Sequence, residues 1–159
     1  MLLVDENIPI KEVRKAIAEI INPIKDFSDR WGIPFQYVDD VIKTDEMEEH
    51  IDEIVEYIKY LDDHQKELAL KRVDNLRNRL ALFKMSTKRL KPLEQFLIYN
   101  VLLVNKTQIE LTEDSRLWEQ YEVTNVSPAK INHLLQAACL KLLELLRYNQ
   151  LKNGRLNFN

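Results

Sequence analysis

Glycine is almost absent from this chain, and its scarcity limits the folds that the chain can adopt. Gly32 and Gly154 are the two glycines among the 159 residues, so residues 33–153 contain none. Tight β-hairpin turns need positive φ angles, which glycine adopts at the lowest cost. A fold made of many hairpins would need such turns repeatedly. We therefore predict an all-α fold.

Composition is typical of one folded domain. Hydrophobic residues make up 45% of the chain and charged residues 31%. No apolar run approaches the roughly 18 residues of a membrane span, and the first residues lack the basic segment and cleavage site of a signal peptide. The single cysteine, Cys139, excludes an internal disulfide and is expected to be buried among Leu and Ala. We expect a cytoplasmic protein without a membrane partner.

Proline, glycine and apolar spacing divide the chain into five or six predicted helices. The first is expected over residues 9–31, with a kink at Pro23 and a stop at Gly32. Shorter helices are predicted over residues 34–42, 92–104 and 112–122.

The last predicted helix, residues 128–151, has the clearest start in the chain. Ser127 suits the N-cap and Pro128 the first helical position, and Gly154 is available for a left-handed cap at the end. Residues 134–146 are apolar on nearly all sides, which predicts a buried central helix.

Apolar residues between positions 47 and 83 have a heptad-like spacing. The spacing favours one continuous helix over about residues 45–85, roughly 60 Å long, around which the bundle is organised. The alternative breaks it at LDDHQ, where Asp62 and Gln65 would form a capping box. Since no Gly or Pro forces that break, we prefer one helix. Its predicted interaction or dimer seam consists of Ile51, Ile54, Ile58, Leu61, Val73, Leu76 and Leu80.

Charge is unevenly distributed over the same stretch. Residues 39–67 contain twelve Asp and Glu against three Lys, whereas residues 71–91 contain eight Lys and Arg against Asp74. This order complements a helix dipole and would also suit antiparallel pairing of two copies in a homodimer. A second interpretation is a binding surface for phosphates or an acidic protein. Its outer stripe would consist of Arg77, Lys84, Lys88 and Lys91.

Residue patterns that indicate catalysis are missing. His50, His64 and His133 belong to neither a Glu-x-x-His nor a His-Glu-x-x-His pattern. Acidic pairs such as Glu46 and Glu49 supply only half of a helical magnesium site, and no glycine-rich loop can hold phosphate. We predict a protein that is not an enzyme and that has no metal, cofactor or small-molecule substrate.

The stretch VTNVSPAKINHLL, which begins at position 123, has features of a helix-turn-helix. Asn125 tolerates positive φ, Val126 can pack inward, and Ser127 can cap the second helix. Ile131 and Leu134 would then face the core. The exposed side of the helix would carry Ala129, Lys130, Asn132, His133 and Gln136.

Together with LKPLEQFLIY, residues 90–99, this turn resembles the promoter-recognising C-terminal domain of sigma factors. More specifically, it resembles phage-borne transcriptional regulators of the ArpU type. The resemblance covers residues 90–147 and is carried by Leu90, Pro92, Glu94, Asn125, Val126, Ser127, Ile131, Leu134 and Ala138. It implies a DNA-binding transcriptional regulator with a C-terminal helix-turn-helix. The candidate DNA-binding residues are Lys130, Asn132, His133, Gln136, Lys141, Lys84, Lys88, Arg89 and Lys91.

The same turn is also a good helix start within a bundle, and residues 110–122 carry five acidic residues against Arg116. The alternative function is therefore a helical adaptor that acts through self-association or a protein partner, without nucleic acid. In either case we expect a single domain over residues 1–159. It has a possible division into a dimerisation part, residues 1–89, and a helix-turn-helix-like part, residues 90–159.

Overall fold

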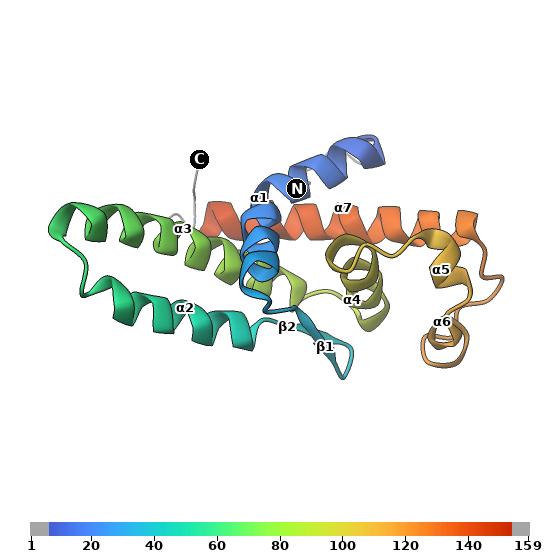
Figure 1. The fold of residues 1–159 in the computed structure, drawn as a ribbon. Helices are drawn as coiled ribbons and strands as arrows, with labels where there is room; N and C mark the ends of the chain where they lie inside the picture. Colours follow the sequence, from blue (N-terminus) through green and yellow to red (C-terminus); the bar gives the residue numbers. More distant parts are fainter. Residues whose placement is uncertain (1–6, 154–159) are drawn as a thin grey trace.

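The computed structural model describes residues 7–153 and confirms the mostly all-α fold (Figure 1). The helices are α1 (Ile10–Trp31), α2 (Asp45–Ile58), α3 (Asp63–Thr87), α4 (Pro92–Leu97), the π-helix η1 (Ile98–Leu103), α5 (Gln108–Thr112), α6 (Ser115–Glu119) and α7 (Pro128–Lys152). The strands are β1 (Gln36–Val38) and β2 (Val41–Lys43). Within residues 7–153, no helix has both the length and the hydrophobicity that crossing a membrane requires.

The last helix is buried at the centre of the fold, as predicted for residues 134–146. The bundle is thus organised around α7, and the prediction that it is organised around residues 45–85 is wrong. α7 packs against α1, α3, α4 and α5, and Figure 1 shows it running behind most of the other elements. The Ser127 hydroxyl accepts a hydrogen bond from the Lys130 N–H at 3.1 Å and so caps the helix. The cap predicted for Gly154 lies outside the described residues. The buried side of α7 carries Ile131, Leu135, Ala138, Cys139, Leu142, Leu143, Leu146 and Asn149.

α1 also follows its sequence signals. Gly32 has a φ of 65° and ends the helix by donating its N–H to the Ser28 carbonyl. Pro23 lies inside α1, and the helix changes direction along its length (Figure 1). Because proline has no N–H, the carbonyl of Glu19 loses its helical donor. The Arg79 guanidinium replaces that donor, at 2.8 Å from the Glu19 oxygen.

The helix predicted over residues 34–42 is wrong. This segment is an antiparallel hairpin in which Val38 pairs with Val41 across a two-residue turn. Asp39 and Asp40 form the turn with φ values of 53° and 63°. Turns of this kind usually contain Asn-Gly or Asp-Gly, but aspartate can adopt positive φ at some cost. The scarcity of glycine therefore does not exclude a single hairpin.

The single helix predicted over residues 45–85 is also wrong, because α2 ends at Ile58 and α3 begins at Asp63. The alternative start is confirmed, since the Asp62 side chain accepts a hydrogen bond from the Gln65 N–H at 2.9 Å. α2 and α3 then lie antiparallel (Figure 1). A heptad-like spacing suits such a helical hairpin as well as it suits one long helix, because both bury an apolar stripe.

The region between α3 and α7 also differs from its prediction. The predicted helix 92–104 is α4 continued by the π-helix η1, while 112–122 is replaced by the two short helices α5 and α6. Each has its own capping residue. Thr107 accepts from the Glu110 N–H at 3.1 Å, and Asp114 accepts from the Arg116 N–H at 2.9 Å. A capping side chain starts a new helix and competes with continuation of the preceding one.

Candidate interaction surfaces

The turn before α7 has the local geometry that a helix-turn-helix needs. Asn125 has a φ of 55°, as predicted, and Ser127 caps α7. However, the preceding helix ends at Glu119 rather than at the predicted Glu122, which itself has a φ of 55°. Residues 120–127 therefore connect α6 to α7. This connection is longer than the roughly three or four residues of the DNA-binding motif.

The predicted DNA-reading side of α7 is largely exposed. Lys130, Asn132 and His133 are exposed, whereas Gln136 is half-buried. Ile131 is buried in the core. The side-chain oxygen of Asn132 accepts a hydrogen bond from Gln108 of α5 at 3.2 Å, so this face of α7 is tied to α5.

Acidic residues are frequent in the segments that precede α7. α5, α6 and the following loop carry Glu110, Glu113, Asp114, Glu119 and Glu122. Arg116 forms an ion pair with Asp114 at 2.6 Å and, by its hydrogen bonds, lowers the pKa of that carboxyl group. The other four carboxylates have no ion pair within residues 7–153. This negative charge opposes the approach of a phosphate backbone.

A polar cluster that the sequence did not indicate fixes the loop before α7. The hydroxyls of Tyr37 and Tyr121 lie 2.7 Å apart, and Tyr121 donates to Asp40 at 2.6 Å. Gln120 also donates to Asp40, at 2.6 Å. Burial raises the pKa of Tyr37 to about 12, and burial together with Asp40 raises the pKa of Tyr121. Both phenols therefore stay protonated at neutral pH, and the cluster joins the β-hairpin to the loop.

The predicted dimer seam is used within one chain. Ile51, Ile58, Val73 and Leu80 are buried between α2, α3 and the core, and Ile54 and Leu76 are partly buried there. For the four buried residues, the expectation that they face a partner is therefore wrong. Leu61 differs, because it lies at the open end of the hairpin and remains 40% exposed.

The uneven charge has the same intramolecular explanation. Arg77 of α3 forms an ion pair with Asp52 of α2, and Lys84 forms one with Glu48 at 3.1 Å. Because α2 and α3 are antiparallel, the acidic start of α2 meets the basic end of α3. Arg77 and Lys84, two members of the predicted basic stripe, are thus paired with carboxylates. Lys88 and Lys91 form no ion pair within the described part of the chain.

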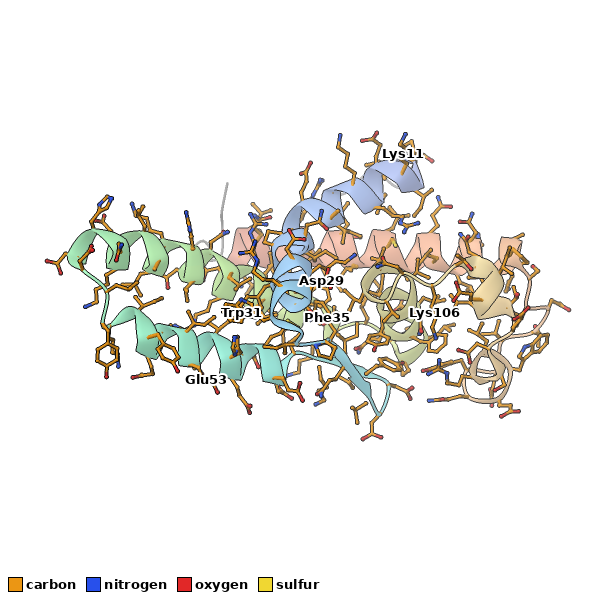
Figure 2. The ribbon with its side chains drawn as sticks, in the orientation of Figure 1. Lys11, Asp29, Trp31, Phe35, Glu53 and Lys106 are labelled. Carbon is orange, nitrogen blue, oxygen red and sulfur yellow. The ribbon has the colours of Figure 1, made fainter. Side chains whose placement is uncertain are left out.

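The far end of the α2–α3 hairpin exposes an apolar surface. We call Tyr57, Tyr60, Leu61 and Leu68 the hairpin tip; they are 75%, 88%, 40% and 46% exposed. Figure 1 shows this end extending beyond the other elements, and Figure 2 shows Glu53 on the outer side of α2. Residues 53–67 add five acidic side chains against two lysines. The tip is both apolar and acidic.

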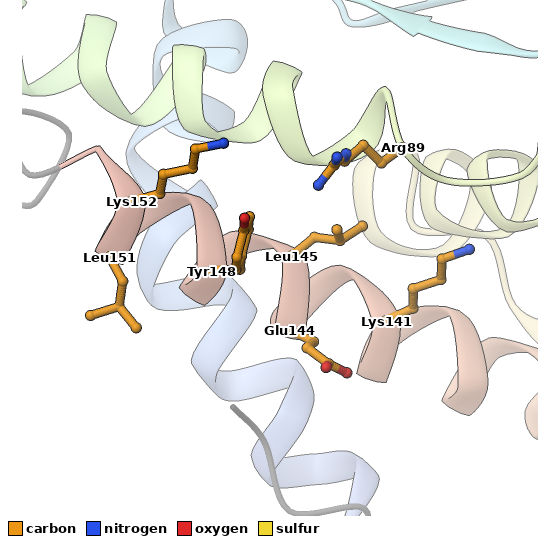
Figure 3. Close-up of a pocket in the computed structure, with 7 residues that line it drawn as sticks. All are labelled: Arg89, Lys141, Glu144, Leu145, Tyr148, Leu151 and Lys152. Atoms are coloured by element: carbon orange, nitrogen blue, oxygen red, sulfur yellow. The ribbon is translucent and has the colours of Figure 1, made fainter. Parts of the chain in front are cut away.

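A groove of opposite charge lies where the end of α3 meets α7. We call it the α3–α7 groove; it has a volume of about 850 Å³. Its lining residues, drawn in Figure 3, are Arg89, Lys141, Glu144, Leu145, Tyr148, Leu151 and Lys152. Lys141 forms an ion pair with Glu94 at 2.9 Å, and the Lys152 ammonium lies 5.9 Å from the centre of the Tyr148 ring. Arg89 has no ion pair within residues 7–153.

The structure therefore separates the predicted DNA-binding residues. Arg89 and Lys141 belong to the α3–α7 groove, and Lys88 lies in a hollow next to it. Lys130 lies near the opposite end of α7, about 33 Å along the helix axis from Lys152. The basic residues and the turn thus do not form one continuous surface.

Burial raises the pKa of the Cys139 thiol to about 11, so little thiolate forms at neutral pH. Within residues 7–153, no group of three or more His, Cys, Asp or Glu residues is placed to hold a metal ion. No family model, curated protein or solved structure matches this chain.

Proposed function

We propose that this chain is a non-catalytic interaction protein that pairs with a second copy of itself. In this pairing the hairpin tip of each copy docks into the α3–α7 groove of the other. The observation that carries the proposal is the match between the two surfaces, since an apolar, acidic tip complements an apolar, basic groove.

The charges favour this pairing. The tip carries Asp63 and Glu67 beside its exposed apolar residues, whereas Arg89 and Lys152 lie at the groove. Glu144 is the one acidic residue among those that line the groove. Complementary charge fixes the orientation of two surfaces and accelerates their encounter.

The positions of the two surfaces also suit a closed dimer. The tip lies at the start of α3 and the groove at its end, about 37 Å apart along a 25-residue helix. Antiparallel placement of two copies therefore brings each tip to the other copy's groove. Such a reciprocal contact has two-fold symmetry and closes at two subunits.

The apolar contacts supply the driving force. A buried aromatic side chain removes about 150–250 Å² of surface from water, at about 25 cal/mol per Å². Tyr57 and Tyr60 are the most exposed aromatic residues at the tip. Because association itself costs about 4–15 kcal/mol, we expect a dimer of moderate affinity.

Sedimentation velocity over a range of protein concentrations tests the proposal. The unchanged chain should shift from monomer to dimer, and Tyr60→Ser should weaken the dimer. Ile109→Ser is the matched control, because Ile109 is 66% exposed on α5, away from both surfaces. A chain that stays monomeric at hundreds of micromolar contradicts the proposal.

A charge exchange tests the orientation. Arg89→Glu should weaken the dimer, and adding Asp63→Lys should restore part of its affinity, because the two opposite charges are exchanged. Lys11→Glu, on α1, is the control for charge reversal. Equal weakening by Arg89→Glu and Lys11→Glu would exclude this contact.

The turn before α7 favours a second candidate, DNA binding by a transcriptional regulator. Asn125 has the positive φ and Ser127 the N-cap hydrogen bond of such a motif, although the connection between α6 and α7 is longer than in the motif. Lys130 and Asn132 are exposed. The resemblance to ArpU-type regulators supports this candidate, while the carboxylates of the segments before α7 place it second. Retention of duplex DNA at low salt, weakened by Lys130→Ala, would support it. Failure to retain any duplex at low ionic strength would remove it.

A further inference from the structure

A smaller cavity lies at the start of α2, next to the end of α3. Its volume is about 270 Å³. It is lined by Val41, Ile42, Lys43, Thr44, Asp45, Lys84, Thr87 and Lys88. Three of these eight residues are lysines, and one is acidic. None of them was assigned above to self-association, so this cavity can be tested separately from the proposed function.

The N-cap of α2 is a buried hydroxyl without a hydrogen-bond partner. Thr44 is 3% exposed, and its Oγ1 has no partner among the described residues. Its backbone, with φ −128° and ψ 15°, keeps the side chain from capping the helix. Ser127 and Asp62 do cap their helices. Buried hydroxyls are almost always hydrogen-bonded, so this one indicates a missing partner.

The first turn of α2 supplies further donors. The N–H groups at the start of an α-helix have no acceptor within the helix, and together they carry a partial positive charge. Because Thr44 does not cap them, the N–H groups of Asp45, Glu46 and Met47 have no side-chain acceptor within residues 7–153. Oxyanions such as phosphate bind to helix starts of this kind.

Three lysines and Asp45 line the cavity, and Glu46 and Glu48 lie in the same first turn of α2. Lys43 and Lys88 are exposed and form no ion pair within the described part of the chain. Lys84 forms an ion pair with Glu48 at 3.1 Å. Asp45 is the acidic residue at the rim, and two unpaired ammonium groups lie on the same cavity. Lys43 and Lys88 are therefore the two groups that could balance the charge of a bound anion.

We propose that this cavity binds a phosphoryl oxyanion. The Thr44 hydroxyl and the first N–H groups of α2 would donate hydrogen bonds to its oxygens, and Lys43 and Lys88 would balance its charge. The group could belong to a small phosphate compound or to a nucleic-acid backbone, since both present the same oxygens.

Titration of the full chain with inorganic phosphate, followed by amide chemical shifts, tests the site. The amide signals of Asp45, Glu46 and Met47 should move together and saturate, whereas chloride at equal ionic strength should not saturate them. Lys88→Gln should weaken phosphate binding about tenfold, because it removes one charge-assisted contact. Thr44→Val keeps the shape of the side chain without its hydroxyl and should weaken binding similarly.

A control variant and an exposed test variant make the result decisive. Thr124→Val, at an exposed loop position, should leave phosphate binding unchanged. Lys88→Gln changes only an exposed residue, so it remains informative if Thr44→Val fails to fold. The absence of saturable shifts, or unchanged binding in Lys88→Gln, would overturn the proposal. If a short DNA duplex displaces phosphate from the amides of Asp45, Glu46 and Met47, the bound phosphoryl group comes from nucleic acid. If the duplex does not displace phosphate, the group comes from small phosphate compounds.

Discussion

The Arg79 guanidinium donates a hydrogen bond to the carbonyl of Glu19 at 2.8 Å, and a second one to the carbonyl of Ile20 at 3.0 Å. Pro23 leaves the Glu19 carbonyl without its helical donor. The long side chain from α3 thus satisfies the backbone of α1 where proline interrupts its hydrogen bonds. Burial lowers the pKa of Arg79, although the group stays charged at neutral pH.

We expect Arg79→Met to destabilise the fold by about 1–2 kcal/mol, because a partly buried charged donor is lost from a carbonyl. Pro23→Ala restores the N–H that bonds Glu19, so Arg79→Met should cost less in that background. Chemical denaturation of the four variants of this double-mutant cycle measures the coupling. If Arg79→Met lowers the free energy of unfolding equally with and without Pro23→Ala, Arg79 does not compensate for the proline.

The cluster of Tyr37, Asp40 and Tyr121 should be measurable in the same way. Tyr121→Phe removes the hydroxyl that donates to Asp40 and should lower the free energy of unfolding by about 1–2 kcal/mol. Tyr99→Phe is the matched control. The Tyr99 ring stacks on Tyr37, but its hydroxyl forms no hydrogen bond within residues 7–153. Similar losses in both variants would show that the hydrogen bond from Tyr121 to Asp40 is not responsible.

Stability should fall in alkaline solution. Burial raises the pKa of Tyr37 from 10.0 to about 12, so in that range the folded chain binds more protons than the unfolded chain. The stabilisation is complete below pH 10 and is lost as pH rises towards 12. Denaturation curves between these values should show a smaller decline for Tyr37→Phe than for the unchanged chain. If the free energy of unfolding declines equally in both chains, burial does not raise the pKa of Tyr37.

Backbone strain outside the core offers a stabilising change. Asp39 and Glu122 have φ values of 53° and 55°, where glycine lies at lower cost than residues with a Cβ. Asp39→Gly and Glu122→Gly should each raise the free energy of unfolding by up to about 1 kcal/mol. Asp26→Gly, on an exposed position inside α1, should lower it by a similar amount. A loss of stability in all three variants would show that the backbone is not strained at Asp39 and Glu122.

Local signals predicted the elements that local contacts determine. Gly32 ends α1 and Ser127 caps α7 through hydrogen bonds to residues at most four positions away, so both boundaries were predictable. The hairpin of residues 36–43 was not. Its turn uses two aspartates, and its Tyr37 contacts Tyr121, 84 residues away. No local pattern indicates that contact.

The candidate surfaces show the same limit. The acidic and basic halves of residues 39–91 were visible in the sequence, but ion pairs such as Lys84 with Glu48 depend on how the chain folds back. The α3–α7 groove depends on it too, because Arg89 and Tyr148 come from distant parts of the chain. The sequence supplied the charges, and the packing of α3 on α7 decided which of them remain unpaired.

The break between α2 and α3 gives the last prediction. Asp62 caps α3 by accepting a hydrogen bond from the Gln65 N–H. Just before it, the N–H groups of Tyr60 and Leu61 donate to the carbonyls of Tyr57 and Ile58, three residues back. Asp62→Ala removes the cap and should lower the free energy of unfolding by about 1 kcal/mol. Asp63→Ala, at the neighbouring first helical position, should cost less because that side chain caps nothing.

The hairpin itself should persist in Asp62→Ala, since buried Ile58 and Val73 hold α2 against α3. Amide exchange tests both points, with faster exchange expected at the first turn of α3 and unchanged protection at Leu80. Loss of protection along all of α3 would mean that the cap, rather than the apolar packing, holds the hairpin together.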